Sequence, residues 1–170
     1  MKNLKGNILR SDWIRFSIKL VILIAILVIT FGFLFGFQRI EGVAMSPHLN
    51  DGDLALFLRS VDTYNADDII VYSHEDKEYS SRIIAVGGDL VTIDDDGNLF
   101  VNNEQVSSAA VYDMSTVESL PISFPQRVPT GSYFLLNDNL DTEEDSRQFG
   151  AVLGTDIDGK IITILRTRIE

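Results

Sequence analysis

Residues 20–37 read Leu-Val-Ile-Leu-Ile-Ala-Ile-Leu-Val-Ile-Thr-Phe-Gly-Phe-Leu-Phe-Gly-Phe, 18 positions without a charged side chain. An α-helix rises about 1.5 Å per residue, so about 20 such residues cross a hydrocarbon layer of about 30 Å. With the two preceding residues, the stretch predicts a transmembrane helix over residues 18–37. A cleaved signal peptide has an apolar segment of only about 7–15 residues. The longer stretch therefore predicts a retained anchor. The other alternative, a buried core helix, is disfavoured because a helix that is apolar on every face fits poorly in so small a domain.

The charges on the two sides of this stretch predict its orientation. Five Lys and Arg residues precede it against the single acid Asp12, whereas Arg39 on the far side is soon followed by acids. Basic residues stay on the cytoplasmic side of a membrane. We therefore expect residues 1–17 to be a cytoplasmic N-terminus. Residues 38–170 are expected to form one extracellular domain, held at the cell membrane by a single pass.

The part that follows the anchor is acidic. Residues 38–170 carry nine Lys and Arg against 24 Asp and Glu, a net charge of −15. Such a charge disfavours nucleic acid as a partner. The acidic runs 94–96 and 141–145 lack the spacing of a calcium loop and predict solvated turns. The chain has no Cys, which excludes disulfides and thiolate metal sites and fits a bacterium without a periplasmic disulfide system. We expect no metal ion and no cofactor.

Beyond residue 37 the unbroken apolar pattern changes to short alternating runs rich in Val, Ile, Phe and Tyr. Such runs, separated by groups that contain Gly, Asp, Asn or Pro, predict an antiparallel β domain. The stretch 106–129 has no clear period and contains three prolines, so it predicts a long loop with at most a short strand or helical turn. The predicted strands are 54–58, 68–72, 80–86, 90–93, 99–101, 133–136 and 161–166. The predicted turns are 50–52, 87–89, 96–98, 129–131 and 158–160.

Three segments behind the anchor carry a recognisable pattern. They are Gly42-Val-Ala-Met-Ser-Pro-His-Leu-Asn-Asp-Gly-Asp53, Tyr79-Ser-Ser-Arg-Ile-Ile-Ala-Val-Gly-Gly-Asp89 and Asn137-Asp-Asn-Leu-Asp-Thr-Glu-Glu-Asp-Ser-Arg-Gln-Phe-Gly150. In this order they resemble the motifs of type I signal peptidases, which are G-x-S-M-x-P-T-L-x-x-G-D, Y-x-K-R-V-I-G-L-P-G-D and G-D-N-R-x-x-S-x-D-S-R-x-F-G. These membrane-bound serine proteases remove signal peptides from exported proteins. The resemblance implies a mainly β fold of the signal peptidase type behind one transmembrane helix.

The same resemblance implies a mechanism with a serine nucleophile and a lysine general base. The nucleophile position falls on Ala44, the lysine position on Ser81, and the serine that orients the lysine on Glu143; the arginine of the third motif falls on Leu140. A methyl group cannot attack a carbonyl, and a Ser/Lys pair acts only as a unit. We therefore expect no intact catalytic set.

Neighbouring side chains are weak substitutes. Ser46 lies two residues beyond the nucleophile position, about 6.6 Å away if the chain is extended there, as Pro47 favours, whereas nucleophile and base must meet within about 3 Å. Lys77 lies about 13 Å along a strand from the base position. Its acidic neighbours favour a charged lysine in a solvated turn. His48 and His74 fit surface positions.

The retained motif residues have structural roles in this interpretation. Gly52 and Gly88 predict tight turns. The resemblance implies an ion pair between Asp145 and Arg147 that holds the third motif. Residues of the expected substrate groove are Gly42, Met45 and Pro47. Residues of the expected structural framework are Gly52, Asp53, Arg82, Gly88, Asp89, Asp138, Asn139, Asp145, Ser146 and Arg147.

The functional hypothesis is a membrane-anchored accessory protein that does not cleave. In signal peptidases the substrate lies extended beside the catalytic strand, and such a groove can still bind a peptide. The chain is similar to signal-peptidase-like proteins that assist pilus assembly in Gram-positive bacteria, which implies an exported partner such as a pilin, with sortase. One alternative is an active signal peptidase; another is a structural membrane protein whose groove binds nothing.

Overall fold

The computed structural model describes residues 2–59, 61–106, 122–142 and 144–166, with side chains from Trp13 onward. The chain divides into two units, Met1–Phe35 and Gly36–Glu170. The first consists of helix α1, Lys2–Leu34. Its stretch Trp13–Leu34 has 22 residues and contains an 18-residue window with a mean hydropathy of 2.7, so it is long and apolar enough to cross a membrane.

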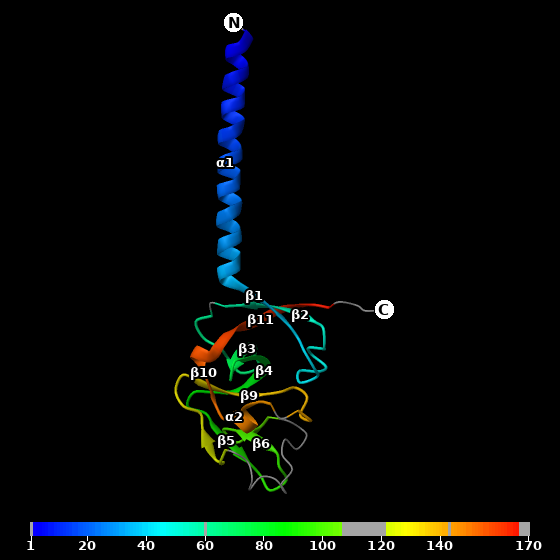
Figure 1. Cartoon of the computed structure of the whole chain (residues 1–170). Helices are drawn as coiled ribbons and strands as arrows, with labels where there is room; N and C mark the ends of the chain where they lie inside the picture. The colour runs from blue at the N-terminus through cyan, green and yellow to red at the C-terminus, as the bar shows by residue number, and fades with distance from the viewer. Residues whose placement is uncertain (1, 60, 107–121, 143, 167–170) are drawn as a thin grey trace. The chain divides into compact units, whose positions relative to one another are not determined.

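Helix α1 ends three residues before the predicted end of the span. The next residues form strand β1, Phe35–Arg39, instead of a last helical turn (Figure 1). Gly36 and Gln38 are buried, whereas Phe37 and Arg39, which follow them in turn, are exposed, and this is the alternation of a strand. A Cβ on Gly36 would overlap the ring of Phe57 in strand β2. The glycine therefore allows β1 to lie close against β2, and this contact was not visible in the hydropathy pattern.

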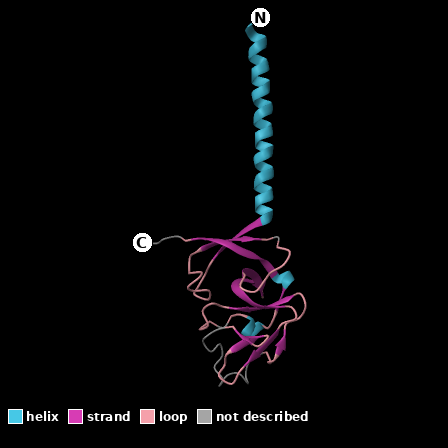
Figure 2. Ribbon diagram, turned by 180° about the vertical axis from the view of Figure 1, so that it is seen from behind, coloured by secondary structure: helices cyan, strands magenta, loops and turns pink. Residues whose placement is uncertain are grey.

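The second unit contains two antiparallel sheets, as the alternating runs predict (Figure 2). The first sheet has seven strands in the order β1-β2-β11-β3-β4-β9-β10. Its strands after β1 are β2 Leu54–Leu58, β3 Ile69–His74, β4 Lys77–Val86, β9 Ser132–Leu136, β10 Val152–Leu153 and β11 Ile157–Leu165.

The second sheet has four strands in the order β7-β6-β5-β8. They are β5 Leu90–Ile93, β6 Leu99–Val101, β7 Glu104–Gln105 and β8 Gln126–Arg127. A single helical turn, α2 Ser146–Phe149, and a 3₁₀ turn, η2 Gly154–Asp156, follow β9 in the chain. The bounds predicted for β2, β5 and β6 are confirmed, whereas β1, β7 and β10 were not predicted. Strand β8 is a short strand within the stretch 106–129, as the prediction for that loop allowed.

The core divides into clusters that match these sheets. Phe134 and Leu136 of β9 pack with Val91 and Leu99 of the four-stranded sheet. On the seven-stranded sheet, Tyr72, Ile83 and Leu135 belong to a second cluster. A third cluster holds Ile40, Met45, Leu49 and Ala55, and it fixes the segment between β1 and β2 that carries the first motif.

One predicted turn is wrong. The triplet 158–160 lies inside strand β11, where Gly159 pairs with Val71 of β3. A Cβ on Gly159 would overlap the carbonyl of Leu58 and the ring of Phe57. Its glycine serves a close approach between strands at a register shift, and the sequence alone does not distinguish this use from a turn.

Two predicted turn glycines are confirmed. Gly52 has φ +83° and Gly88 has φ +103°, a region that side chains with a Cβ rarely adopt. A neighbouring aspartate closes each turn: the Asp53 carboxylate accepts the N–H of Asn50 at 3.0 Å, and the Asp89 carboxylate accepts the N–H of Val86 at 2.8 Å. These framework residues therefore hold the ends of strands in place.

Candidate functional site

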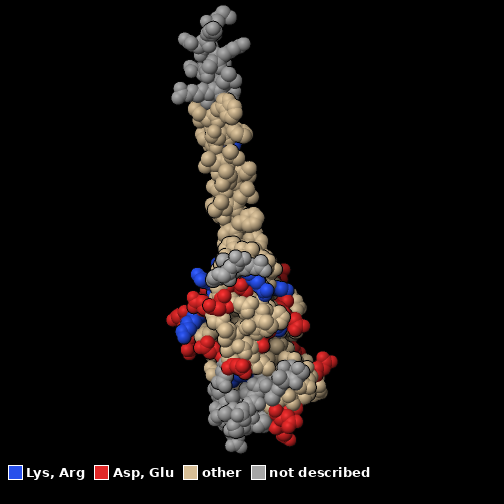
Figure 3. All heavy atoms as spheres, turned by 90° about the vertical axis from the view of Figure 1, so that its right-hand side faces the viewer, with Lys and Arg blue, Asp and Glu red and all other residues tan. Residues whose placement is uncertain are grey.

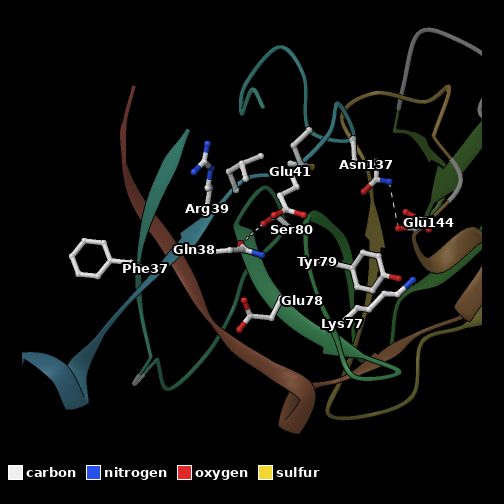
Figure 4. A pocket seen from close by; sticks show the side chains of 13 residues that line it. Phe37, Gln38, Arg39, Glu41, Lys77, Glu78, Tyr79, Ser80, Asn137 and Glu144 are labelled. Atoms are coloured by element: carbon white, nitrogen blue, oxygen red, sulfur yellow. Dashed lines mark hydrogen bonds between the residues drawn. The ribbon is translucent and has the colours of Figure 1, made fainter. Parts of the chain in front are cut away.

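A pocket of about 570 Å³ opens between the segment that leaves β1 and the first half of β4 (Figure 4). It contains the predicted nucleophile position, Ala44, and the buried Met45. Its other lining residues are Phe37, Gln38, Arg39, Ile40, Glu41, Lys77, Glu78, Tyr79, Ser80, Asn137 and Glu144. Residues from the first and third motifs and from β4 thus meet at one cavity.

The first half of β4 has a strand partner on one side only. Its register with β3 runs from Lys77 to Arg82, whereas its register with β9 begins at Arg82. Residues 77–81 therefore present a free strand edge within the described sheet, and four of them line the pocket. The Ser80 hydroxyl donates to Gln38 Oε1 at 2.6 Å, which ties this edge to β1 (Figure 4).

The segment around Ala44 is a series of turns, so the expectation of an extended chain before Pro47 is wrong. Ser46 N–H donates to the carbonyl of Val43 at 3.1 Å, and Leu49 N–H donates to the carbonyl of Met45 at 2.8 Å. Local hydrogen bonds and the packing of Leu49 in the core override the preference of a residue before proline. Ser46 therefore does not project beside Ala44 along a strand; its hydroxyl lies 3.4 Å from Asn50 Oδ1.

The predicted groove residues separate in space. Met45 lies beneath the pocket with 2% of its surface exposed. Gly42 and Pro47 are exposed and do not belong to the described lining. Gly42 instead takes part in a turn, where its N–H donates to Asp51 Oδ1 at 2.9 Å.

The predicted base position, Ser81, is completely buried. Its hydroxyl donates to Asn137 Oδ1 at 2.7 Å and lies 3.3 Å from the hydroxyl of Tyr72. Burial raises the pKa of the Tyr72 phenol, which therefore stays protonated and can donate to Ser81. Asn137 Nδ2 donates in turn to Thr142 Oγ1 at 3.1 Å. The base position is thus part of a closed set of neutral hydrogen bonds.

Lys77 and the two histidines lie in different surroundings. Lys77 is exposed at the start of β4, and it lines the pocket that contains Ala44, which the prediction of a solvated turn did not include. His48 Nδ1 lies 2.8 Å from Asp138 Oδ2, and the ring of His74 stacks on Phe149 with 4.2 Å between centroids. Neither histidine is among the residues that line the pocket.

The framework of the third motif is buried and paired. The predicted ion pair is confirmed: Arg147 Nη2 lies 2.8 Å from Asp145 Oδ2, and the exposed fractions of these side chains are 4% and 0%. The Asp145 carboxylate also accepts the N–H of Asn137 at 2.9 Å. Ser146 Oγ accepts the N–H of Leu135 at 2.9 Å. Glu143, the predicted orienting position, lies outside the described residues.

Two further contacts attach this motif to the other two. Arg82 donates from Nε and Nη2 to the two carboxylate oxygens of Asp138, each at 2.8 Å. This bidentate contact raises the pKa of Arg82. Asn139 N–H donates to the carbonyl of Ala44 at 2.9 Å, and Asn139 Nδ2 donates to the carbonyl of Val43 at 3.1 Å. Arg82, Asp138 and Asn139 thus hold the three motifs together.

Sequence reasoning missed Asn137, which lines the pocket and binds Ser81. The available signal was that Asn137 stands where the third family motif begins with glycine. The acidic run 94–96 is a turn in which Asp94 accepts Asn98 N–H at 2.9 Å and Asn98 Nδ2 at 2.8 Å. Within the described part of the chain, no three His, Cys, Asp or Glu side chains gather as a metal site would require.

A family model described as signal peptidase, peptidase S26, matches residues 11–165. The chain belongs to this family of serine peptidases. Signal peptidase I P of Bacillus subtilis subsp. natto is 34% identical over 158 residues, 86% of this chain and 82% of the relative. A Staphylococcus aureus protein named inactive signal peptidase IA is 28% identical over 155 residues, 87% of this chain and 88% of the relative. A crystal structure of a signal peptidase I from Enterococcus faecalis V583 matches with 25% identity and a TM-score of 0.48, covering 61% of this chain and all of that one.

Membership places the pocket in context. The family is associated with membranes, in keeping with the apolar α1. The part of this chain that follows α1 is mainly antiparallel β, as the resemblance to the family implies. Relatives of comparable similarity carry names with and without the word inactive. Activity in this chain therefore depends on the side chains of its own pocket.

Proposed function

We propose that this chain is a membrane-anchored signal peptidase homologue that does not cleave and instead binds an extended segment of an exported protein in the pocket beside β4. One observation carries the proposal: the two positions where the family mechanism needs serine and lysine are occupied by Ala44 and by a buried, hydrogen-bonded Ser81. The anchor then serves to keep the pocket at the membrane surface.

The chemistry supports loss of cleavage. Ala44 offers no lone pair for attack, and the hydroxyl of Ser81 is engaged by Asn137 and Tyr72. Loss of a nucleophile and base that act as a unit costs about 10⁶-fold in turnover. Binding does not depend on these groups, because an extended peptide is held mainly by backbone hydrogen bonds.

The free edge of β4 supports binding. Residues 77–81 pair with β3 alone among the described strands, so an added strand can take the place beside them. The apolar floor of Ile40, Ala44 and Met45 suits small side chains of such a strand. A groove of this kind gives affinity through the backbone and selects residues through shallow pockets.

The charges around the pocket favour a partner with charged side chains. Among the described residues, the five charged groups of the lining take part in no ion pair within the chain. They are Arg39, Glu41, Lys77, Glu78 and Glu144. The surrounding domain is acidic, and Figure 3 shows Asp and Glu spread over one of its faces. Such a field accelerates association with a basic segment and weakens with salt.

The partner we propose is an exported protein such as a pilin, together with sortase. This step rests on the resemblance to signal-peptidase-like proteins of pilus assembly. The orientation we propose, with residues 38–170 outside the cell, rests on the charges beside the span and places the pocket where an exported protein passes.

An active signal peptidase is the second candidate, and one observation favours it. Lys77 lines the same pocket as Ala44, so an amine belongs to the cavity that contains the nucleophile position. Several relatives, including one from Bacillus licheniformis that is 30% identical over 148 residues, are named signal peptidase I.

Cleavage of a preprotein by the purified full-length chain in detergent tests the two candidates. We expect no product, and the same result for Lys77→Ala. Product formation that Lys77→Ala abolishes would establish the second candidate and overturn the proposal.

Capture of a purified pilin or sortase by the membrane-embedded chain tests binding. Ala44→Phe fills the pocket and should abolish capture. Ala66→Phe makes the same change at an exposed turn outside the pocket and should leave capture intact. Equal capture by both variants would show that the pocket is not the binding site.

A further inference from the structure

Tyr72, Ser81, Asn137 and Thr142 form a chain of side-chain hydrogen bonds between β3, β4 and the third motif. Thr142 Oγ1 donates to the carbonyl of Asn139 at 2.7 Å, so it accepts from Asn137 Nδ2 at 3.1 Å. This orients the amide of Asn137 with Oδ1 toward Ser81, which donates to it at 2.7 Å. The remaining proton, on the Tyr72 hydroxyl 3.3 Å away, then points to Ser81. The hydroxyl groups of Tyr72, Ser81 and Thr142 therefore each donate in one direction only.

This row of hydrogen bonds gives every side-chain donor of Tyr72, Ser81 and Asn137 a partner at the buried end of the pocket. Asn137 Nδ2 also lies 3.4 Å from the carbonyl of Glu144, so both amide hydrogens and the amide oxygen have partners (Figure 4). Ser81 is completely buried, and 2% of Asn137 is exposed. A buried polar network of this kind is stable only while every member is satisfied.

Asn137 links Ser81 to the pocket. Asn137 lines the cavity that contains Ala44, whereas Ser81 is not among the residues of that lining and directs its hydroxyl at the Asn137 amide. A lysine at position 81 has three more heavy atoms along its side chain than serine. To reach the cavity it must displace the amide of Asn137, which is held on both sides.

We infer that Asn137 closes the general-base position of this protein, and that it is the positioning residue which ties the third motif to β4. The inference extends the proposed function, because it adds a position at which the site has been rebuilt. It explains how the loop with Asp138 and Asn139 stays docked on Val43 and Ala44 although the base position carries a short side chain.

The inference makes the effects of two substitutions depend on each other. Ser81→Lys introduces bulk and a buried ammonium beside an amide that cannot move, so it destabilises the domain strongly. Asn137→Gly removes the obstacle and restores the glycine of the family motif. In the Asn137→Gly background, the same lysine gains the space vacated by the amide.

Thermal unfolding of the full-length chain in detergent, followed by tyrosine near-ultraviolet circular dichroism, measures this coupling. We expect Ser81→Lys to lower the melting temperature by about 8 °C or more with Asn137 present and by less than half as much with Asn137→Gly. Ser81→Ala controls for the lost hydroxyl: it removes only the hydrogen bond to Asn137, so its effect should depend on the background much less than that of Ser81→Lys. Equal lowering by Ser81→Lys in both backgrounds overturns the inference, and unfolding of the Ser81→Lys protein that Asn137→Gly reverses supports it.

Cleavage separates this inference from the proposed function. A variant with Ala44→Ser and Ser81→Lys should stay inert while Asn137 is present. Cleavage by that variant contradicts the inference and leaves the proposed function intact. Cleavage by the unmodified chain contradicts the proposed function, and the coupling of melting temperatures still decides the role of Asn137.

Discussion

The framework of the third motif and the rim of the pocket, by which we mean the five charged residues of its lining, differ in how their charges are paired. Asp145 and Arg147 are buried and satisfy each other, and Arg82 holds Asp138 with two hydrogen bonds. The charged groups of the rim, among them Glu41 and Lys77, are exposed and form no ion pair with the rest of the described chain. Charges inside the framework therefore contribute to stability, whereas charges on the rim are available to a partner.

The largest expected effect is at Asp145. Asp145→Asn keeps the volume but replaces the buried carboxylate that lies 2.8 Å from Arg147 Nη2 with a neutral amide, which costs about 3–5 kcal/mol of the free energy of unfolding. Denaturant unfolding of the full-length chain measures it. Asp141→Asn changes an exposed acid of the same motif and should cost less than about 0.5 kcal/mol. Similar costs at both positions would contradict the division into framework and rim.

A smaller effect is expected at Arg82. Arg82→Lys keeps the charge but loses the bidentate contact with Asp138, which costs about 1–2 kcal/mol. The matched control is Arg39→Lys, the same change on the rim, which should leave the unfolding midpoint unchanged. A midpoint for Arg82→Lys as high as that of Arg39→Lys would show that Asp138 does not depend on the paired geometry.

The rim is expected to affect association and not stability. Glu41→Gln should change the free energy of unfolding by less than about 0.5 kcal/mol but slow association with a basic exported segment several-fold at low salt. Surface plasmon resonance at two salt concentrations measures this, and the difference should shrink at high salt. Glu104→Gln, on the four-stranded sheet, is the control and should leave the association rate unchanged. A rate for Glu41→Gln equal to that of the control would remove the rim from recognition.

The smallest effect is a shift in titration. Hydrogen bonds from Asn98 lower the pKa of Asp94 in the folded chain. Because the folded pKa is depressed, this contribution to stability is present above the unfolded pKa of about 3.9 and is lost as pH falls through the folded value. Asn98→Ala should raise the Asp94 midpoint toward about 3.9 in an NMR titration, because it removes the side-chain hydrogen bond to the carboxylate. An unchanged midpoint would show that the turn itself sets the value.

Local pattern was sufficient for some strands and not for others. Strands β2, β5 and β6 are short apolar runs that each follow a predicted turn, so their bounds were predicted from sequence. Strand β1 continues an apolar stretch without a break, and its change from helix to strand depends on the fit of Gly36 against Phe57. Strands of only two residues, such as β10, carry too few side chains for a period to be visible.

The site shows the same division. The resemblance to the family predicted the Asp145–Arg147 pair, because both residues stand at motif positions that this sequence retains. It did not predict that Lys77 lines the same cavity as Ala44, since that depends on the path of the chain between β1 and β2. The turns around Ala44 were also missed, because burial of Met45 and Leu49 decides them.

The sequence by itself determined the apolar anchor, the antiparallel β domain behind it, the family motifs and the residue types that occupy them, among them Ala44 and Ser81. These follow from hydropathy, alternation and spacing, which are local properties of the chain. Only the tertiary structure decided that Ser81 and Asn137, 56 residues apart, share a buried hydrogen bond. Contacts over such separations exist only where the packing of the sheet brings β4 and the end of β9 together, so no local pattern contains them.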